Sequence, residues 1–432
     1  MFVVEQMIQE TERLCMQDCI TVKRDCCRFC GLRLHHTFVD LGMSPLCESY
    51  LQLDQLNHME PFYPLHVYVC ERCFLVQLQE YVSPEHIFSD YAYFSSYSDT
   101  WLQHAKSYTE MAATRFHLDR ESQVVEVASN DGYLLQYFAA QQIPVLGIEP
   151  AANVAAVAKN KGIPTVVKFF GEKTARELVA SRKQADLLLG NNVLAHVPDI
   201  NDFVRGMKIL LKPHGVITME FPHLLRLVEG NQFDTIYHEH FSYLSFFTVG
   251  KIFASHGLTL FDVEEIPTHD GSLRTYACHS DDTSKPITQR VLELHAREEA
   301  TGFTRLDHYF SFTEKVKETK RKLLDFLIAA KRQRKSIVGY GAPGKGNTLL
   351  NYCGIRTDFL DYVVDRSPYK QGKFLPGTHI PIFHPDKIEA IKPDYVLILP
   401  WNLKGEVMEQ ISYIRNWGGR FVVPIPEVEV CA

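Results

Sequence analysis

Hydrophobic residues along this chain alternate between the spacing of a strand and the spacing of a helix. Apolar side chains recur at helical spacing over residues 100–118, and an apolar run over 123–128 follows, as expected of a buried strand. Regular alternation of this kind predicts an α/β fold with a parallel sheet. The expected elements are strands over 123–128, 144–148, 185–189 and 216–220 and helices over 133–140, 151–161 and 199–211, with 248–256, 258–266 and 273–278 closing the domain.

A second, shorter alternation begins after a charged amphipathic helix that we expect over residues 312–335. A buried strand over 336–341 leads into a glycine-containing turn and a helix, and further strands follow at 359–364, 395–399 and 421–423. This pattern predicts a second, smaller Rossmann-like domain. A chain of 432 residues also exceeds one core of typical size, so two or three domains are expected.

Cysteines are concentrated near the N-terminus, where Cys27 and Cys30 form one C-x-x-C pair and Cys70 and Cys73 form another. Two such turns offer four thiolates to one tetrahedral zinc ion, and a closed four-thiolate site has a structural role. We therefore predict structural Zn²⁺ at these residues, with two chance pairs as the alternative. Four further cysteines are additional candidates, with Cys26 a direct competitor of Cys27: Cys15, Cys19, Cys26 and Cys47.

The amino-acid composition excludes only broad classes of function. With 46% hydrophobic and 22% charged residues and a net charge of -7, the chain is expected to be a soluble protein that binds small molecules and not nucleic acid. Its apolar runs fall short of the roughly 18–20 residues of a membrane helix. The N-terminal residues lack the basic and apolar regions of a signal peptide, so we expect a cytoplasmic protein without membrane association.

Polar side chains follow the strands of the first domain, where ligand loops belong in an open α/β sheet. Ser129, Asn130, Asp131 and Gly132 form a turn with a single glycine, which suits a ligand carrying cationic groups better than a dinucleotide pyrophosphate. Glu149, at the tip of the next strand, is placed to bind ribose hydroxyls. Further along lie Asn191, Asn192 and His196, and the phenol-rich segment 90–97 reads as a binding loop or a tyrosine-rich edge strand.

The segment from Tyr237 to Tyr243 places two imidazoles, a carboxylate and two phenols within seven residues. Such a segment is either a hydrated surface loop or a site of proton transfer. A different turn lies in the second domain, where Gly339 to Lys345 has the glycine and lysine spacing of a Walker A loop. Gly346 occupies the position of the magnesium-binding Ser or Thr, so we do not expect ATPase activity.

These motifs together resemble the sugar C-methyltransferase family, S-adenosylmethionine-dependent enzymes that methylate C-3 of nucleotide-linked 4-keto-deoxysugars. The similarity extends over roughly residues 26–425. It implies a zinc-binding domain over 1–90, a class I methyltransferase domain over 91–310 and a Rossmann-like domain over 311–432. The motifs are, in order, CRFCG with CERC, EVASNDGYLL, GIEPAANVA, NNVLAHV, YHEHFSY, GYGAPGKGNTLLN and VDRSPYKQG.

The resemblance also implies roles for individual residues. His240 falls at the position of the general base, with Tyr237 and Glu239 beside it, while His196 and Tyr91 fall on the substrate side. It implies that Ser129, Asn130, Asp131, Gly132 and Glu149 form the S-adenosylmethionine loop and the ribose carboxylate, that Asn192 lies among the substrate-side polar residues, and that Lys345 and Lys370 are candidates for the nucleotide phosphates. We also predict cofactor-binding roles for Asn191 and Asn192 and a scaffold role for His238.

The sequence departs from the family pattern in two turns. His269 precedes Asp270 and Gly271 where a second glycine is expected, and the C-terminal turn reads Ala-Pro-Gly-Lys where smaller residues are expected. The expected partner is a nucleotide-linked 4-keto-deoxysugar, and the expected assembly is a monomer or homodimer.

Three other functions fit parts of the pattern. An O- or N-methyltransferase would share the cofactor turn but needs no base for a C–H bond. A nicotinamide-dependent oxidoreductase would use the C-terminal glycine turn. A non-catalytic zinc protein would leave Glu239 and His240 in a hydrated loop.

Overall fold

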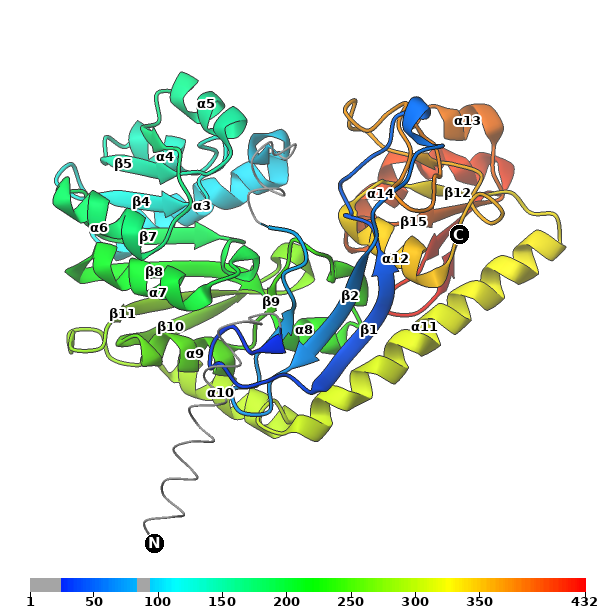
Figure 1. Ribbon diagram of the computed structural model, residues 1–432. Helices are drawn as coiled ribbons and strands as arrows, with labels where there is room; N and C mark the ends of the chain where they lie inside the picture. The colour runs from blue at the N-terminus through cyan, green and yellow to red at the C-terminus, as the bar shows by residue number, and fades with distance from the viewer. Residues whose placement is uncertain (1–24, 84–93) are drawn as a thin grey trace, which may run out of the picture. The chain divides into compact units, whose positions relative to one another are not determined.

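A computed structural model describes residues 25–83 and 94–432 (Figure 1). Within the described residues the chain forms two compact units, each assembled from three segments. Of the described residues, the first unit takes in 25–36, 68–83, 94–223 and 241–306, and the second takes in 37–67, 224–240 and 307–432. Tyr91, Cys15 and Cys19 lie outside the described residues.

A seven-stranded sheet forms the centre of the first unit, in the order β10-β11-β8-β7-β4-β5-β6. The strands from β4 to β8 are parallel, and β11 and β10 join antiparallel at one edge, which confirms the α/β class. Its strands are β4 (Val124–Val127), β5 (Val145–Ile148), β6 (Thr165–Val166), β7 (Ala185–Asn191), β8 (Leu211–Pro222), β10 (Leu258–Ile266) and β11 (Ser272–His279).

Helices cover both faces of this sheet, because strand residues on both sides are apolar. On one face α3 and α4 pack through residues such as Ala105, Tyr108 and Phe138. On the other face α6, α7, α9 and α10 bury residues such as Phe203 and Phe253. The helices are α3 (Asp99–Arg115), α4 (Leu135–Ala140), α5 (Ala152–Asn160), α6 (Glu172–Ala180), α7 (Ile200–Leu210), α9 (Phe246–Ser255) and α10 (Gln289–Thr301).

The cysteine-bearing segment belongs to the first unit and shares its core. Cys27, Cys70, Cys73 and Leu75 lie in the same buried cluster as the residues of α7 and α9. The short strand β3 (Val76–Leu78) pairs antiparallel with β9 (Ser242–Tyr243).

The second unit is centred on a six-stranded sheet in the order β14-β13-β12-β15-β16-β17, parallel except for β17. The long helix α11, yellow in Figure 1, leads into it. The parallel alternation is that of a Rossmann-like domain. Its elements are α11 (Leu306–Arg332), β12 (Ile337–Tyr340), α12 (Gly344–Cys353), β13 (Val363–Val364), β14 (Ile382–Phe383), α13 (Lys387–Ile391), β15 (Tyr395–Ile398), α14 (Lys404–Gln410), β16 (Arg420–Val423) and β17 (Glu429–Cys431), with α8 (Leu224–Glu229) and residues 37–44 and 63–67 of β1 (His36–Ser44) and β2 (Tyr63–Val69) from earlier in the chain.

Several elements differ in extent from the sequence prediction. The strand expected over 359–364 contains only Val363–Val364, because Phe359 and Leu360 both donate backbone hydrogen bonds to the Arg356 carbonyl and so form a turn. Helix α11 begins at Leu306, before the expected start at 312. Helices α6, α8, α10, α13 and α14 were not predicted.

Candidate functional site

Four sulfur atoms meet in the first unit, as the two C-x-x-C pairs predict. The Sγ atoms of Cys27 and Cys73 lie 3.5 Å apart, as do those of Cys30 and Cys70, and all four lie within 4.8 Å of one another. A zinc ion with Zn–S bonds of about 2.3 Å needs sulfur atoms at roughly this separation. The donor set and its spacing therefore fit Zn²⁺ in a closed, structural site.

Both knuckles use the same backbone turn. The amide of Cys27 bonds the Leu32 carbonyl at 2.7 Å, and that of Cys70 bonds the Leu75 carbonyl at 3.0 Å. Each turn ends with a positive φ angle, +72° at Gly31 and +61° at Phe74. Glycine adopts this conformation without strain, whereas a phenylalanine there is held by its surroundings.

Of the other candidate cysteines, the two that the structure describes, Cys26 and Cys47, are not part of this cluster. Cys26 forms an antiparallel bridge with Arg33, and Cys47 lies in the second unit. Cys27 also accepts a hydrogen bond from the side chain of Gln77, whose Nε2 lies 3.2 Å from the Cys27 Sγ. An amide donor there stabilises the charge of a zinc-bound thiolate.

The predicted cofactor turn lies between β4 and α4 in the same unit. Glu149 accepts backbone hydrogen bonds from Asn130 and Ala151, each at 2.9 Å, and this holds the turn against the end of β5. Asn130 has a φ of +47° and Gly132 a φ of +77°. A Cβ at Gly132 would also approach Ile163 Cγ1 to 3.1 Å, so glycine is favoured on two grounds.

Three carboxylates gather around this turn. Glu126 is fully buried on β4, and burial together with the charges of Glu149 and Asp131 raises its pKa well above the usual range. Burial also raises the pKa of Glu149, against the opposing effect of its two backbone hydrogen bonds. Lys161 offsets part of the negative charge at Asp131, at 3.2 Å. A site this acidic fits a ligand with cationic groups, and S-adenosylmethionine carries a sulfonium and an ammonium.

Asn191 is the last residue of β7, which pairs parallel with β4, and Asn192 follows it. The side-chain amide of Asn191 is buried, and neither its oxygen nor its nitrogen bonds to any described residue, so it retains hydrogen-bonding capacity for a ligand. Asn192 has a φ of +54°, and its amide donates to the Glu220 carbonyl at 2.8 Å. His196 follows in the short helix Leu194–His196.

The segment that holds the predicted base is divided between the two units: Tyr237–His240 belongs to the second and Phe241–Tyr243 to the first. His240 Nδ1 lies 2.9 Å from the Thr235 carbonyl oxygen, which can only accept a hydrogen bond. The proton of the neutral ring is therefore on Nδ1, and Nε2 carries the lone pair. The Tyr237 ring lies against the imidazole, with centroids 4.2 Å apart.

His238 and Glu239, which lie between Tyr237 and His240 in the sequence, are both buried and make different hydrogen bonds. His238 donates through Nε2 to the Pro64 carbonyl at 3.2 Å, and burial lowers its pKa. Glu239 accepts from the Cys47 thiol, with Oε1 3.8 Å from Sγ. Burial, reinforced by the charge of Glu239, raises the pKa of Cys47 well above its usual value, so the thiol stays a donor.

Helix α12 and the loop after β15 also support this segment. Thr348 donates to the Ile236 carbonyl at 3.0 Å, and Trp401 Nε1 donates to Asp234 Oδ2 at 2.7 Å. Burial raises the pKa of Asp234 to about 6, although Lys345 and the Trp401 hydrogen bond oppose this shift. Sequence reasoning did not identify Asp234 or Trp401, and it named Cys47 only as a candidate metal ligand, because their contacts join residues that are far apart in the chain.

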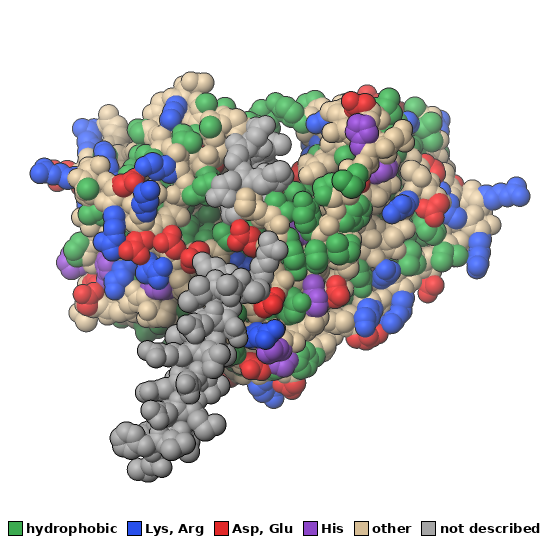
Figure 2. Space-filling model, viewed as in Figure 1, with side chains coloured by type: hydrophobic (Ala, Val, Ile, Leu, Met, Phe, Trp, Pro, Cys, Tyr) green, Lys and Arg blue, Asp and Glu red, His purple; other side chains and the backbone are tan. Residues whose placement is uncertain are grey.

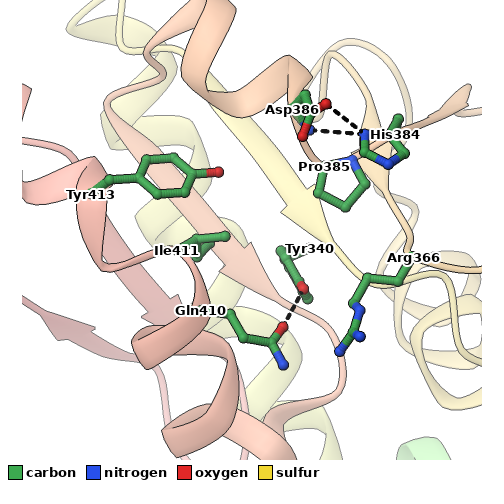
Figure 3. Close-up of a pocket in the computed structure, with 8 residues that line it drawn as sticks. All are labelled: Tyr340, Arg366, His384, Pro385, Asp386, Gln410, Ile411 and Tyr413. Carbon is green, nitrogen blue, oxygen red and sulfur yellow. Dashed lines mark hydrogen bonds and ion pairs between the residues drawn. The ribbon is translucent and has the colours of Figure 1, made fainter.

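The two predicted phosphate-binding lysines lie in the second unit with protein partners. Lys345 donates to Asn402 Oδ1 at 2.9 Å, and Lys370 donates to the Ala342 carbonyl at 2.9 Å. A separate cavity of about 440 Å³ lies near the carboxyl ends of β12, β13 and β14 (Figure 3), and neither lysine lines it. Its lining is Tyr340, Arg366, His384, Pro385, Asp386, Gln410, Ile411 and Tyr413.

Basic and acidic side chains are interspersed on the face drawn in Figure 2. Residues 25–83 and 94–432 include no helix with the length and apolar character needed to cross a bilayer.

Two features of the first unit indicate the class of this protein. Its parallel sheet has an acidic turn with a single glycine after β4 and a carboxylate at the tip of β5, and four cysteines meet in the same unit. Family profiles match the same three parts: a zinc binding domain over residues 27–88, a methyltransferase domain over 101–263 and a C-methyltransferase C-terminal domain over 267–426. The protein is a zinc-binding, S-adenosylmethionine-dependent methyltransferase.

One similar protein extends over nearly the whole chain. The C-methyltransferase NovU from Streptomyces niveus is 34% identical over 415 residues, which cover 96% of this chain and 98% of NovU. The chain therefore belongs to the C-methyltransferase family.

Other similarities are confined to part of the chain. A ubiquinone biosynthesis O-methyltransferase from Rhodopseudomonas palustris is 26% identical over 96 residues, or 22% of this chain and 38% of that protein. An S-adenosylmethionine-dependent methyltransferase from Clostridium acetobutylicum, solved by crystallography, has a TM-score of 0.34 and 11% identity over 41% of this chain and 92% of its own. The family assignment rests on NovU.

Proposed function

We propose that this C-methyltransferase acts on C-3 of a nucleotide-linked 4-keto-deoxysugar, with His240 as the base that removes the C-3 proton. S-adenosylmethionine supplies the methyl group as an electrophilic sulfonium. A carbon beside a ketone becomes nucleophilic only when its proton leaves, so the enzyme must provide a base and stabilise the enolate oxygen.

The tautomer of His240 is the observation that carries this proposal. Its Nδ1–H is committed to the Thr235 carbonyl at 2.9 Å, so the neutral ring presents the Nε2 lone pair needed by a base. His238 differs, because it is buried and its Nε2 already donates to the Pro64 carbonyl. The sequence contains both imidazoles in one cluster, and their hydrogen bonds favour His240 as the base.

The neighbouring residues complete the proposed chemistry. Glu239 provides a carboxylate near the base, and the phenol of Tyr237 is a candidate donor to the enolate oxygen. We assign His196 and Tyr91 to the substrate side. The cofactor residues in this proposal are Ser129, Asn130, Asp131, Gly132, Glu149, Asn191 and Asn192.

The proposal divides the work among three parts of the chain: residues 1–90 for zinc, 91–310 for methyl transfer and 311–432 for the nucleotide. Lys345 and Lys370 are the proposed phosphate ligands, since a lysine at a glycine turn binds phosphate as a point charge. Binding would require each ammonium to exchange its present partner, Asn402 Oδ1 or the Ala342 carbonyl, for phosphate oxygens.

The test begins with the wild-type enzyme and a set of nucleotide 4-keto-deoxysugars, with mass spectrometry to detect the gain of one methyl group. On the accepted sugar, His240→Asn should abolish methylation and the exchange of the C-3 proton with deuterated solvent, because both need the base. S-adenosylmethionine binding, measured by calorimetry, should remain.

His384→Asn is the control, because His384 belongs to the same unit and its imidazole pairs only with Asp386 in the described structure, at 3.2 Å. His384→Asn should retain both methylation and the exchange of the C-3 proton. Proton exchange at the wild-type rate in His240→Asn would show that another group is the base.

A further inference from the structure

A hydrogen-bonded chain of three ionisable side chains crosses the face of the first unit's sheet that α3 covers. His104 Nε2, on α3, lies 2.8 Å from Glu220 Oε2, and Arg274 Nε lies 2.7 Å from Glu220 Oε1. Glu220 and Arg274 face each other across the β8–β11 pair. Glu220 is 1% exposed in its side chain, Arg274 9% and His104 18%, so the chain runs from a buried pair to a partly accessible imidazole.

This arrangement fixes the tautomer of His104. Burial alone raises the pKa of Glu220, but the His104 hydrogen bond and the charge of Arg274 outweigh it and lower the pKa below the usual value. Glu220 is therefore a carboxylate, which can only accept, so His104 carries a proton on Nε2. The neutral ring then presents the Nδ1 lone pair. No described residue makes a hydrogen bond with Nδ1.

Aromatic contacts hold the ring in place. Trp101 stacks on His104 with centroids 5.1 Å apart and 20° between planes, and Trp101 also stacks with Tyr133, with centroids 6.1 Å apart. Tyr133 directly follows Gly132 of the cofactor turn, and the rings of His269 and Trp101 meet edge to face with centroids 5.6 Å apart. The imidazole thus belongs to the set of side chains around the proposed cofactor turn.

The strand order indicates which part of the reaction His104 faces. Glu149 at the end of β5 marks the ribose side, and β4 and β7 lie between it and β8. Glu220 is paired with Asn191 across β7 and β8. In an open parallel sheet the ligands lie outside the carboxyl ends of the strands, so β8 is on the side away from the ribose, where the methyl acceptor belongs.

We propose that His104, held by Glu220 and Arg274, binds the substrate by accepting a hydrogen bond from the hydroxyl or amino group on the methyl-accepting carbon. The inference rests on the proposed function, in which that carbon is C-3 of a keto-sugar. His104 orients the methyl-accepting carbon, and it moves no proton itself. Glu220 and Arg274 are positioning residues.

The test is a cycle that combines an enzyme variant with a substrate analogue. His104→Phe keeps a ring of similar shape for stacking on Trp101 but cannot accept a hydrogen bond. With the accepted sugar it should lower kcat/KM about 10- to 100-fold, since the buried donor loses its partner. With the analogue that carries hydrogen in place of the C-3 hydroxyl or amino group, wild type and His104→Phe should have equal kcat/KM.

His36→Asn is the matched control, because His36 forms a similar pair with Glu71 at 2.7 Å in the same unit, on a more exposed surface. It should match wild type on both substrates. His104→Asn provides a second variant, and zinc content and S-adenosylmethionine affinity are measured for each protein. Both should equal wild type if His104 contacts the substrate.

The possible failures are distinguishable. If wild-type enzyme methylates no nucleotide keto-sugar, the proposed function fails and the inference fails with it. If wild type is active but His104→Phe and His104→Asn match His36→Asn, only the inference is overturned. An equal loss on sugar and analogue, or a loss that follows S-adenosylmethionine affinity, would also overturn it and assign His104 to the fold or to the cofactor.

Discussion

Replacing Glu298 should destabilise the first unit far more than replacing its neighbour Glu299. Glu298 lies on α10 with no exposed surface, and its carboxylate accepts three hydrogen bonds. The donors are the amides of Phe246 and Phe247 at the start of α9, at 2.8 and 2.7 Å, and Nε2 of the buried His223 at 2.6 Å. The carboxylate therefore satisfies the N-terminus of one helix and a buried imidazole together.

The size of the effect follows from these three contacts. A hydrogen bond to a charged group contributes about 1.5–3 kcal/mol, but bonds that share one acceptor do not add fully. Removing one partner of a buried ionic group typically costs about 3–5 kcal/mol, and we expect Glu298→Ala to lie in this range. Glu298→Gln should cost about 1–3 kcal/mol, because its amide keeps one acceptor but turns an NH₂ group toward donors.

The assay must report on one unit, since a chain of several domains need not unfold in two states. The sequence has three tryptophans, and only Trp101 lies in the first unit. In a Trp401→Phe/Trp417→Phe background, fluorescence during urea unfolding of the zinc-loaded protein therefore follows this unit. Exposed Glu299 is the control, and Glu299→Ala should change stability by less than about 0.5 kcal/mol. If Glu298→Ala and Glu299→Ala unfold at the same urea concentration, this reasoning is refuted.

Two further predictions concern the zinc site and a buried carboxyl. Cys73→Ser should lose its zinc and destabilise the first unit by several kcal/mol, because three of the four ligands lie in that unit's core, whereas Cys26→Ser should retain one zinc per chain by metal analysis. Zinc loss in Cys26→Ser would contradict the ligand assignment. The pKa of Asp234 is raised to about 6, against about 3.9 when unfolded, so its stabilising effect is full below about pH 4 and lost as the pH rises through 6. In a Trp101→Phe/Trp417→Phe background, the protein with Asp234 should therefore lose about 2–3 kcal/mol between pH 4 and 7 relative to Asp234→Asn, as measured by urea unfolding with Trp401 fluorescence; parallel curves would refute the shift.

The zinc site could be predicted because its information is local. Each C-x-x-C turn is closed by backbone hydrogen bonds between residues a few positions apart, such as Cys27 with Leu32 and Cys70 with Leu75. The prediction then required only that the two turns lie close enough in the fold to share one zinc ion. The α/β class followed for a similar reason, because the period of the apolar positions distinguishes strand from helix before any tertiary contact is known.

Contacts between distant residues could not be predicted in this way. The Arg274–Glu220–His104 chain depends on the register of β8 against β11 and on which face of the sheet α3 covers. A shift of one residue in that register would place Arg274 on the opposite face and leave Glu220 without its ion pair. The sequence contains all three residues, but only the sheet brings them together.

The segment Tyr237–His240 shows where sequence reasoning reaches its limit in assigning chemistry. Its density of ionisable groups indicates a site, but density does not distinguish His238 from His240. The distinction comes from two carbonyls: Pro64 fixes Nε2–H on His238, and Thr235 fixes Nδ1–H on His240. Thr235 is near in the sequence and Pro64 is not, so the proposal of His240 as the base depends on hydrogen bonds that only the folded chain determines.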